Sequence, residues 1–86
     1  MTGRTRETVV RFASPFRLAG FDAALPAGDY RVDHDEEAID FAQRLAWRRV
    51  ASFLHLPAIG SPAAARQMVP IDPADLDSAI ERDPQS

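Results

Sequence analysis

The chain has 86 residues, of which 45% are hydrophobic and 27% are charged, and its formal net charge is −3. This composition excludes a disordered chain and predicts one small, marginally stable domain, because a chain of this length buries only about 60–65% of the surface that unfolding exposes. No apolar run approaches the roughly 20 residues that a membrane helix needs, and the N-terminal residues lack the apolar segment of a secretory signal. We therefore expect a cytoplasmic protein with no membrane partner.

Three residue types are absent, and two of these absences exclude kinds of chemistry. The sequence contains no Cys, no Lys and no Asn. Without cysteine there is no disulfide, no thiolate nucleophile and no cysteine-ligated metal site. Without lysine there is no side-chain Schiff base and no P-loop lysine. We expect no cofactor.

Charge is arranged in blocks along the chain. The net charge is +3 over residues 1–20, −6 over 21–43, +4 over 44–66 and −4 over 67–86. Alternating blocks favour pairing within the fold or between subunits over a surface of a single sign.

The N-terminal part of the chain predicts two strands. Residues 1–6 are expected to form a flexible arm, followed by a single domain over residues 7–83. Residues 8–12 are β-branched and aromatic, which is typical of a strand, and residues 16–18 can form a second, short strand.

The turn at residues 25–28 is the clearest local signal. Pro26 suits the second position of a type I turn and Gly28 suits the fourth. The β-type residues that follow predict a strand over about residues 29–34.

Residues 36–56 are ambiguous. Over residues 36–47, apolar side chains recur at helical spacing, which favours a helix. Residues 48–56 fit either the continuation of this helix or a strand, because no glycine or proline separates the two halves.

The C-terminal part is better defined. Residues 67–71 predict a short strand, and Pro70 restricts it to the edge of a sheet or to a strand end. Asp72 as N-cap and Pro73 at the first helical position predict a helix, which Asp83 and Pro84 end. We expect residues 84–86 to be a frayed tail.

Two motifs resemble those of short uncharacterised bacterial proteins: LPAG-x-Y-x-V at residues 25–32 and D-P-x-x-L-x-x-A at residues 72–79. The resemblance implies an antiparallel sheet with a helix and favours a strand at 48–56, and it implies no activity and no site residue. We predict an α+β fold, with a small antiparallel sheet of about four or five strands, a C-terminal helix and a helical segment near residues 36–47.

The segment 33–37, Asp-His-Asp-Glu-Glu, is the densest polar cluster. His34, Asp33 and Asp35 are candidates for a metal site or an acid–base pair, and the alternative is a solvated end of a strand or helix. On a strand, His34 faces away from Asp33 and Asp35, which weakens the metal hypothesis. His55, the second histidine, is either a ligand or base, or a packed, hydrogen-bonded side chain.

Aromatic and arginine side chains are enriched at protein interfaces, which makes Phe41, Trp47 and Phe53 candidates for an interface with Arg48 and Arg49 at its rim. Packing in the core is the alternative for the aromatic residues.

The leading hypothesis is a non-enzymatic protein-interaction module that self-associates. Its expected partner is a second copy, in a homodimer, or another protein. One alternative is a small enzyme or metal-binding accessory protein that uses the acidic cluster around His34. The other is a nucleic-acid-binding regulator that uses Arg44, Arg48 and Arg49, which the acidic charge of the chain disfavours.

Overall fold

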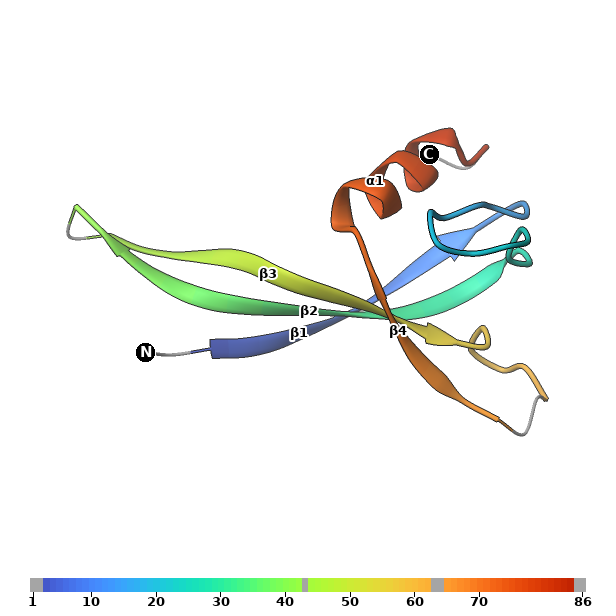
Figure 1. The fold of residues 1–86 in the computed structure, drawn as a ribbon, viewed down its shortest axis with the longest axis horizontal. Coiled ribbons are helices and arrows are strands. Elements are labelled where there is room, and N and C mark those ends of the chain that lie inside the picture. The colour runs from blue at the N-terminus through green and yellow to red at the C-terminus, as the bar shows by residue number, and fades with distance from the viewer. Residues whose placement is uncertain (1–2, 43, 63–64, 85–86) are drawn as a thin grey trace.

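The sheet of this protein is a four-stranded antiparallel meander with one helix on one side of it (Figure 1). The computed structural model describes residues 3–42, 44–62 and 65–84, and of Phe41 only the backbone. The elements are β1 (Gly3–Phe12), β2 (Gly28–Phe41), β3 (Arg44–Leu56), β4 (Gln67–Ile71) and α1 (Pro73–Arg82). Each strand pairs with its neighbour in the sequence, in the order β1-β2-β3-β4. The predicted α+β fold class is confirmed.

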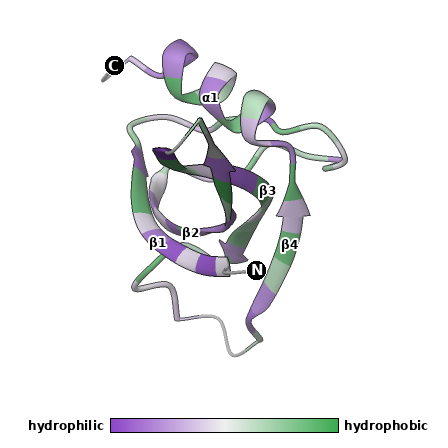
Figure 2. Ribbon diagram, turned by 90° about the vertical axis from the view of Figure 1, so that its left-hand side faces the viewer, coloured by the Kyte–Doolittle hydropathy of each residue, from purple (hydrophilic) through white to green (hydrophobic). Residues whose placement is uncertain are grey.

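The molecule is elongated, with principal extents of 45 × 29 × 21 Å. The β2–β3 hairpin projects from one end, while α1 and the loop over residues 13–27 lie together on one side of the sheet (Figure 1). Figure 2 looks along the long axis and shows how strongly the sheet coils, with α1 above it. This coiling is the accumulated right-handed twist of the strands.

The core lies between the sheet and α1 and is built from both ends of the chain. Its buried members are Phe12, Phe16, Leu18, Tyr30, Val32, Leu54, Leu76 and Ala79. The rings of Phe12 and Phe16 stack with their centroids 3.6 Å apart, and Tyr30 meets Phe16 edge-on at 5.2 Å. Alternation along the strands sends Phe12, Tyr30, Val32 and Leu54 to the covered face, and the other core residues come from the 13–27 loop and from α1.

The prediction of a helix over residues 36–47 is wrong. Glu36 to Phe41 continue β2, and Arg44 to Trp47 begin β3, so this segment is the tip of a hairpin. Pairing of β2 with β3 on one side, and with β1 as far as Glu37 on the other, overrides the helical spacing of the apolar residues. The strand alternative for residues 48–56 is confirmed, since they lie within β3.

Two predictions for the N-terminal part also need correction. Residues 3–6 were expected in a flexible arm, yet they belong to β1 and pair with residues 34–37 of β2. Residues 16–18 do not form a strand; Phe16 makes one isolated bridge with Leu25. The strand predicted over about 29–34 is present but extends to Phe41.

The predicted start of the C-terminal helix is confirmed. The Asp72 side chain accepts a hydrogen bond from the Ala74 amide at 2.9 Å, and Pro73 opens α1. The carboxylates of Asp75 and Asp83 then accept backbone amides of the 13–27 loop, Ala19 at 2.6 Å and Ala13 at 3.0 Å. Among the described residues, no helix is long and apolar enough to cross a membrane.

Candidate functional site

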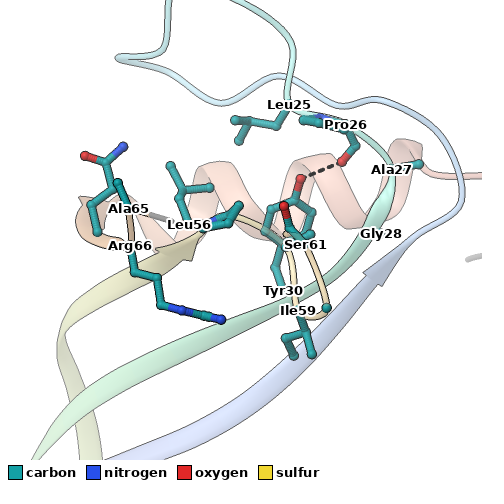
Figure 3. Close-up of a pocket in the computed structure, with 14 residues that line it drawn as sticks. Leu25, Pro26, Ala27, Gly28, Tyr30, Leu56, Ile59, Ser61, Ala65 and Arg66 are labelled. Atoms are coloured by element: carbon teal, nitrogen blue, oxygen red, sulfur yellow. Dashed lines mark hydrogen bonds between the residues drawn. The ribbon is translucent and has the colours of Figure 1, made fainter. Parts of the chain in front are cut away.

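An apolar cavity of about 740 Å³ opens beside the core, and its lining residues come from the loops and strand ends rather than from α1 (Figure 3). One wall is the turn at residues 25–28 with Tyr30. The other is the end of β3 with the loop over residues 57–61, and residues 65–67 close one side. The core therefore continues into an accessible hollow.

A backbone hydrogen bond joins the two walls of this cavity. The Ile59 amide donates to the Asp29 carbonyl at 2.7 Å, and within the first wall the Tyr30 hydroxyl donates to the Pro26 carbonyl at 2.6 Å. Gly28 has a φ of +149°, and a Cβ atom there would lie 3.2 Å from the Cβ of Ala58. Glycine at this position lets the walls approach, and burial raises the pKa of the Tyr30 hydroxyl.

A second cavity of about 320 Å³ adjoins the first and shares Leu56, Pro57, Ile59 and Arg66 with it. Its remaining lining residues are Arg31 and His55. These two side chains belong to the face of the sheet opposite α1, so the two cavities meet around the end of β3, with Arg66 common to both.

An ion network crosses this opposite face. His55 Nε2 lies 2.8 Å from Asp33 Oδ2, and Arg31 donates to Asp33 at 3.1 Å and to Glu7 at 2.5 Å. Burial alone would raise the pKa of Asp33, but the hydrogen bonds from His55 and Arg31 outweigh it and lower this pKa below its usual value. Asp33 is thus an ionised partner that holds the side chains of Arg31 and His55 in place.

His34 lies on the other face, as the alternation of the strand predicted. Its Nδ1 is 2.7 Å from the Ser52 hydroxyl, and both side chains are buried. Burial, followed by the charges of Arg49 and Arg6, lowers the pKa of His34 and favours the neutral ring.

The acidic cluster of residues 33–37 does not lie at the solvent-exposed end of a strand or helix. It lies in the middle of β2, where Asp33, His34 and Glu36 are all buried. His34 does not converge with Asp33 and Asp35, nor with His55, because they lie on opposite faces. Among the described residues, no three His, Asp or Glu side chains gather as metal ligands would.

The predicted interface residues do not form one patch. A bulge between Asp35 and Glu36 leaves Val50 without a partner on β2 and pairs Ala38 with Trp47. Counting along β3 from this register puts Trp47 and Arg49 on the covered face, and Phe53 and Arg48 on the opposite one. The Phe41 side chain lies outside the described part of the structure.

Three of these side chains, Trp47, Arg48 and Arg49, have contacts within the fold. The Arg4 guanidinium lies 3.9 Å from the centre of the Trp47 ring and donates to Glu36 at 2.7 Å, a hydrogen bond that lowers the Glu36 pKa. Arg48 pairs with Glu37, and Arg49 approaches Asp77 of α1 at 3.7 Å. Arg44, an exposed residue, shares the face of Arg48, so the three arginines proposed for nucleic acid do not lie on one surface.

The free edge of β1 is the feature that the sequence analysis missed. The ten residues of this strand pair with β2 on one side, and no described strand lies on the other. The β-branched residues at 8–10 mark a strand, but nothing in a sequence says that a strand is outermost. The strand order of the sheet is what places β1 at the edge.

No protein-family model, curated protein or solved structure matches the chain. The resemblance to short bacterial proteins with the two motifs remains a prediction.

Proposed function

We propose that this protein is a self-associating interaction module in which β1 of one copy pairs antiparallel with β1 of a second copy. The observation that carries the proposal is the contrast between the two edges of the sheet. β4, at one edge, has five residues and contains Pro70, which lacks an amide donor. β1, at the other edge, has ten residues with no proline and no bulge.

Natural proteins protect exposed sheet edges with short strands, prolines and bulges, because a free edge presents a row of unpaired backbone groups. β4 carries two of these devices. β1 carries none of the three, and its protection is limited to charged side chains at Arg4, Arg6, Glu7 and Arg11. An edge left open over ten residues is suited to accept another strand.

The side chains of β1 support one register. When Val9 lies on the two-fold axis, Glu7 of each copy faces Arg11 of the other, and Val9 meets its own counterpart. Centring the pair on Glu7 instead would oppose two carboxylates, which is unfavourable. Within each copy Arg11 already pairs with Asp29 at 2.9 Å and Glu7 with Arg31 at 2.5 Å, so the dimer would join two ion networks.

Val9 has the exposure that such a contact requires. Its side chain is 63% exposed, on the face that no described helix covers. Joining two four-stranded sheets covers this residue and extends the hydrogen-bonded ladder. A domain of this size has a small core, and association stabilises it by mass action.

The test is a charge-swap experiment at Val9. Sedimentation velocity over a wide concentration range should show a dimer for the wild type and a monomer for both Val9→Glu and Val9→Arg, because each places two like charges on the two-fold axis. An equimolar mixture of the two variants should dimerise again, since opposite charges then meet.

Val50→Glu is the matched control, because Val50 is similarly exposed, at 52%, but lies in β3. This variant should dimerise like the wild type. A wild type that stays monomeric at high concentration overturns the proposal. Loss of the dimer in Val50→Glu but not in Val9→Glu would assign the interface to the β2–β3 hairpin instead.

A further inference from the structure

We propose that the apolar cavity between residues 25–30 and 56–67 binds a small amphiphile, with an apolar body in the cavity and a single carboxylate paired with Arg66. This inference is independent of the pairing through β1, because no residue of β1 lines the cavity.

The cavity has the size and lining of a small-molecule site. Its volume of about 740 Å³ lies in the range of ligand pockets, and most of its lining is apolar. Leu25, Leu56 and Ala58 pack against the core from the cavity walls, so the walls are anchored rather than loose. Ile59 at the rim is 54% exposed, and a bound apolar body would cover part of it.

The charges around the cavity select an anion. The chain has 13 acidic residues and a net charge of −3, yet no carboxylate lines either of the two adjoining cavities among the described residues. The charged or titratable side chains there are Arg66, Arg31, His55 and the neutral phenol of Tyr30. Such a surface attracts a carboxylate and repels a cation.

Arg66 is the cation available to a ligand. Arg31 is paired with Asp33 and Glu7, and His55 is paired with Asp33. Within the described ranges, Arg66 forms no ion pair, and it lines both cavities. In Figure 3 its side chain extends beneath Leu56. A guanidinium can hold a carboxylate through two parallel hydrogen bonds.

The backbone of the walls favours a small molecule over a peptide. Peptide strands are recognised mainly through main-chain hydrogen bonds. Here the Ile59 amide donates to the Asp29 carbonyl and the Ser61 amide donates to the Ala58 carbonyl, so these two loop amides are already engaged. Most of the lining is apolar, and among the described residues Arg66 is the one charged side chain in the larger cavity.

The experiment is a titration followed by two-dimensional NMR, using decanoate as the probe and decyltrimethylammonium as a probe of the same chain length and opposite charge. Decanoate should shift the amide signals of the non-proline residues within 25–30 and 56–61, and the ammonium probe should not. Arg66→Gln should weaken decanoate binding about tenfold, as expected for a charge-assisted hydrogen bond. Ala27→Trp, at an exposed position of the wall, should abolish it by filling the cavity.

Arg44→Gln is the control, since it removes the same charge from the distant end of the hairpin, and it should bind decanoate like the wild type. Equal shifts with both probes, or unchanged affinity in Arg66→Gln, would overturn the proposal. The titration is repeated on Val9→Glu. If Val9→Glu binds decanoate but stays monomeric, ligand binding and dimerisation are independent. Each of the two proposals can then be rejected without the other.

Discussion

At the scale of single residues, burial determines which polar groups respond to pH. His34 and Asp33 are adjacent in β2 and both buried, but their environments differ. Asp33 is surrounded by donors that stabilise its charge, while His34 lies against a serine hydroxyl and near two arginines. The first residue is therefore held charged and the second neutral.

The lowered pKa of His34 predicts that acid destabilises the fold in the range where only histidine titrates. The unfolded chain, with an ordinary His pKa of about 6.5, binds the proton more readily than the folded one. The free energy of unfolding therefore decreases as the pH falls below about 6.5, by at most about 1.4 kcal/mol per pH unit for one proton, until the lowered pKa of the folded state is reached.

Thermal melts between about pH 7.5 and 5.5 measure this slope, a range centred on the ordinary histidine value. His34→Gln removes the titrating group and should flatten the dependence. His55→Gln keeps His34 and should leave its contribution in place. A full slope in His34→Gln would show that His34 is not its source.

At the scale of elements, the hairpin tip explains the main error of the sequence analysis. Residues 42–43 join β2 to β3, where two-residue loops usually carry Asn-Gly or Asp-Gly. The sequence here is Ala-Gln, so it offers no turn signal between two segments with helical spacing. Ala42 nevertheless adopts a φ of +47°, because the pairing of the two strands requires it.

The positive φ of Ala42 leads to a prediction about stability. Alanine in the left-handed region costs about 1–2 kcal/mol, whereas glycine adopts it freely. Ala42→Gly should therefore raise the free energy of unfolding by about 0.5–1 kcal/mol, after allowing for the greater entropy of the unfolded glycine chain. Chemical denaturation measures the change.

Ala46→Gly is the comparison variant, since Ala46 is an exposed residue within β3. It should lower the free energy of unfolding by about 0.5–1 kcal/mol, the usual cost of glycine inside a strand. If both variants lower it equally, strain at Ala42 is not being relieved.

The contrast with α1 shows which elements a sequence can reveal. Asp72 and Pro73 specify the start of α1 through local contacts, and the sequence alone predicted it. The extension of β1 and β2, the order of the strands and the cavity at Arg66 depend on partners far apart in the chain. For the same reason the opposite faces of Trp47 and Phe53 were hidden, because the bulge at Val50 shifts the register between them.

At the scale of the whole molecule, the two ends of the chain hold the core together. α1 follows the last strand, yet the carboxylates of Asp75 and Asp83 bind amides of the loop that follows the first strand. The sheet has a covered face because these contacts fix the helix against the loop. Asp83 is buried and accepts from both Ala13 and Ser14, at 3.0 and 3.3 Å.

We therefore expect Asp83→Ala to loosen α1 from the sheet. The substitution leaves two loop amides without their acceptor, and the loss of such charge-assisted hydrogen bonds costs about 1–3 kcal/mol. Asp77→Ala, which removes only the exposed contact with Arg49 at 3.7 Å, should change stability by less than about 0.5 kcal/mol. Hydrogen exchange should accelerate in residues 73–82 and 12–19 of Asp83→Ala while the amides of β2 and β3 stay protected. Uniform acceleration across the sheet would mean that the helix and the sheet unfold as one unit. The Asp83 contact would then stabilise the whole molecule, and not only the attachment of α1 and the 13–27 loop to the sheet.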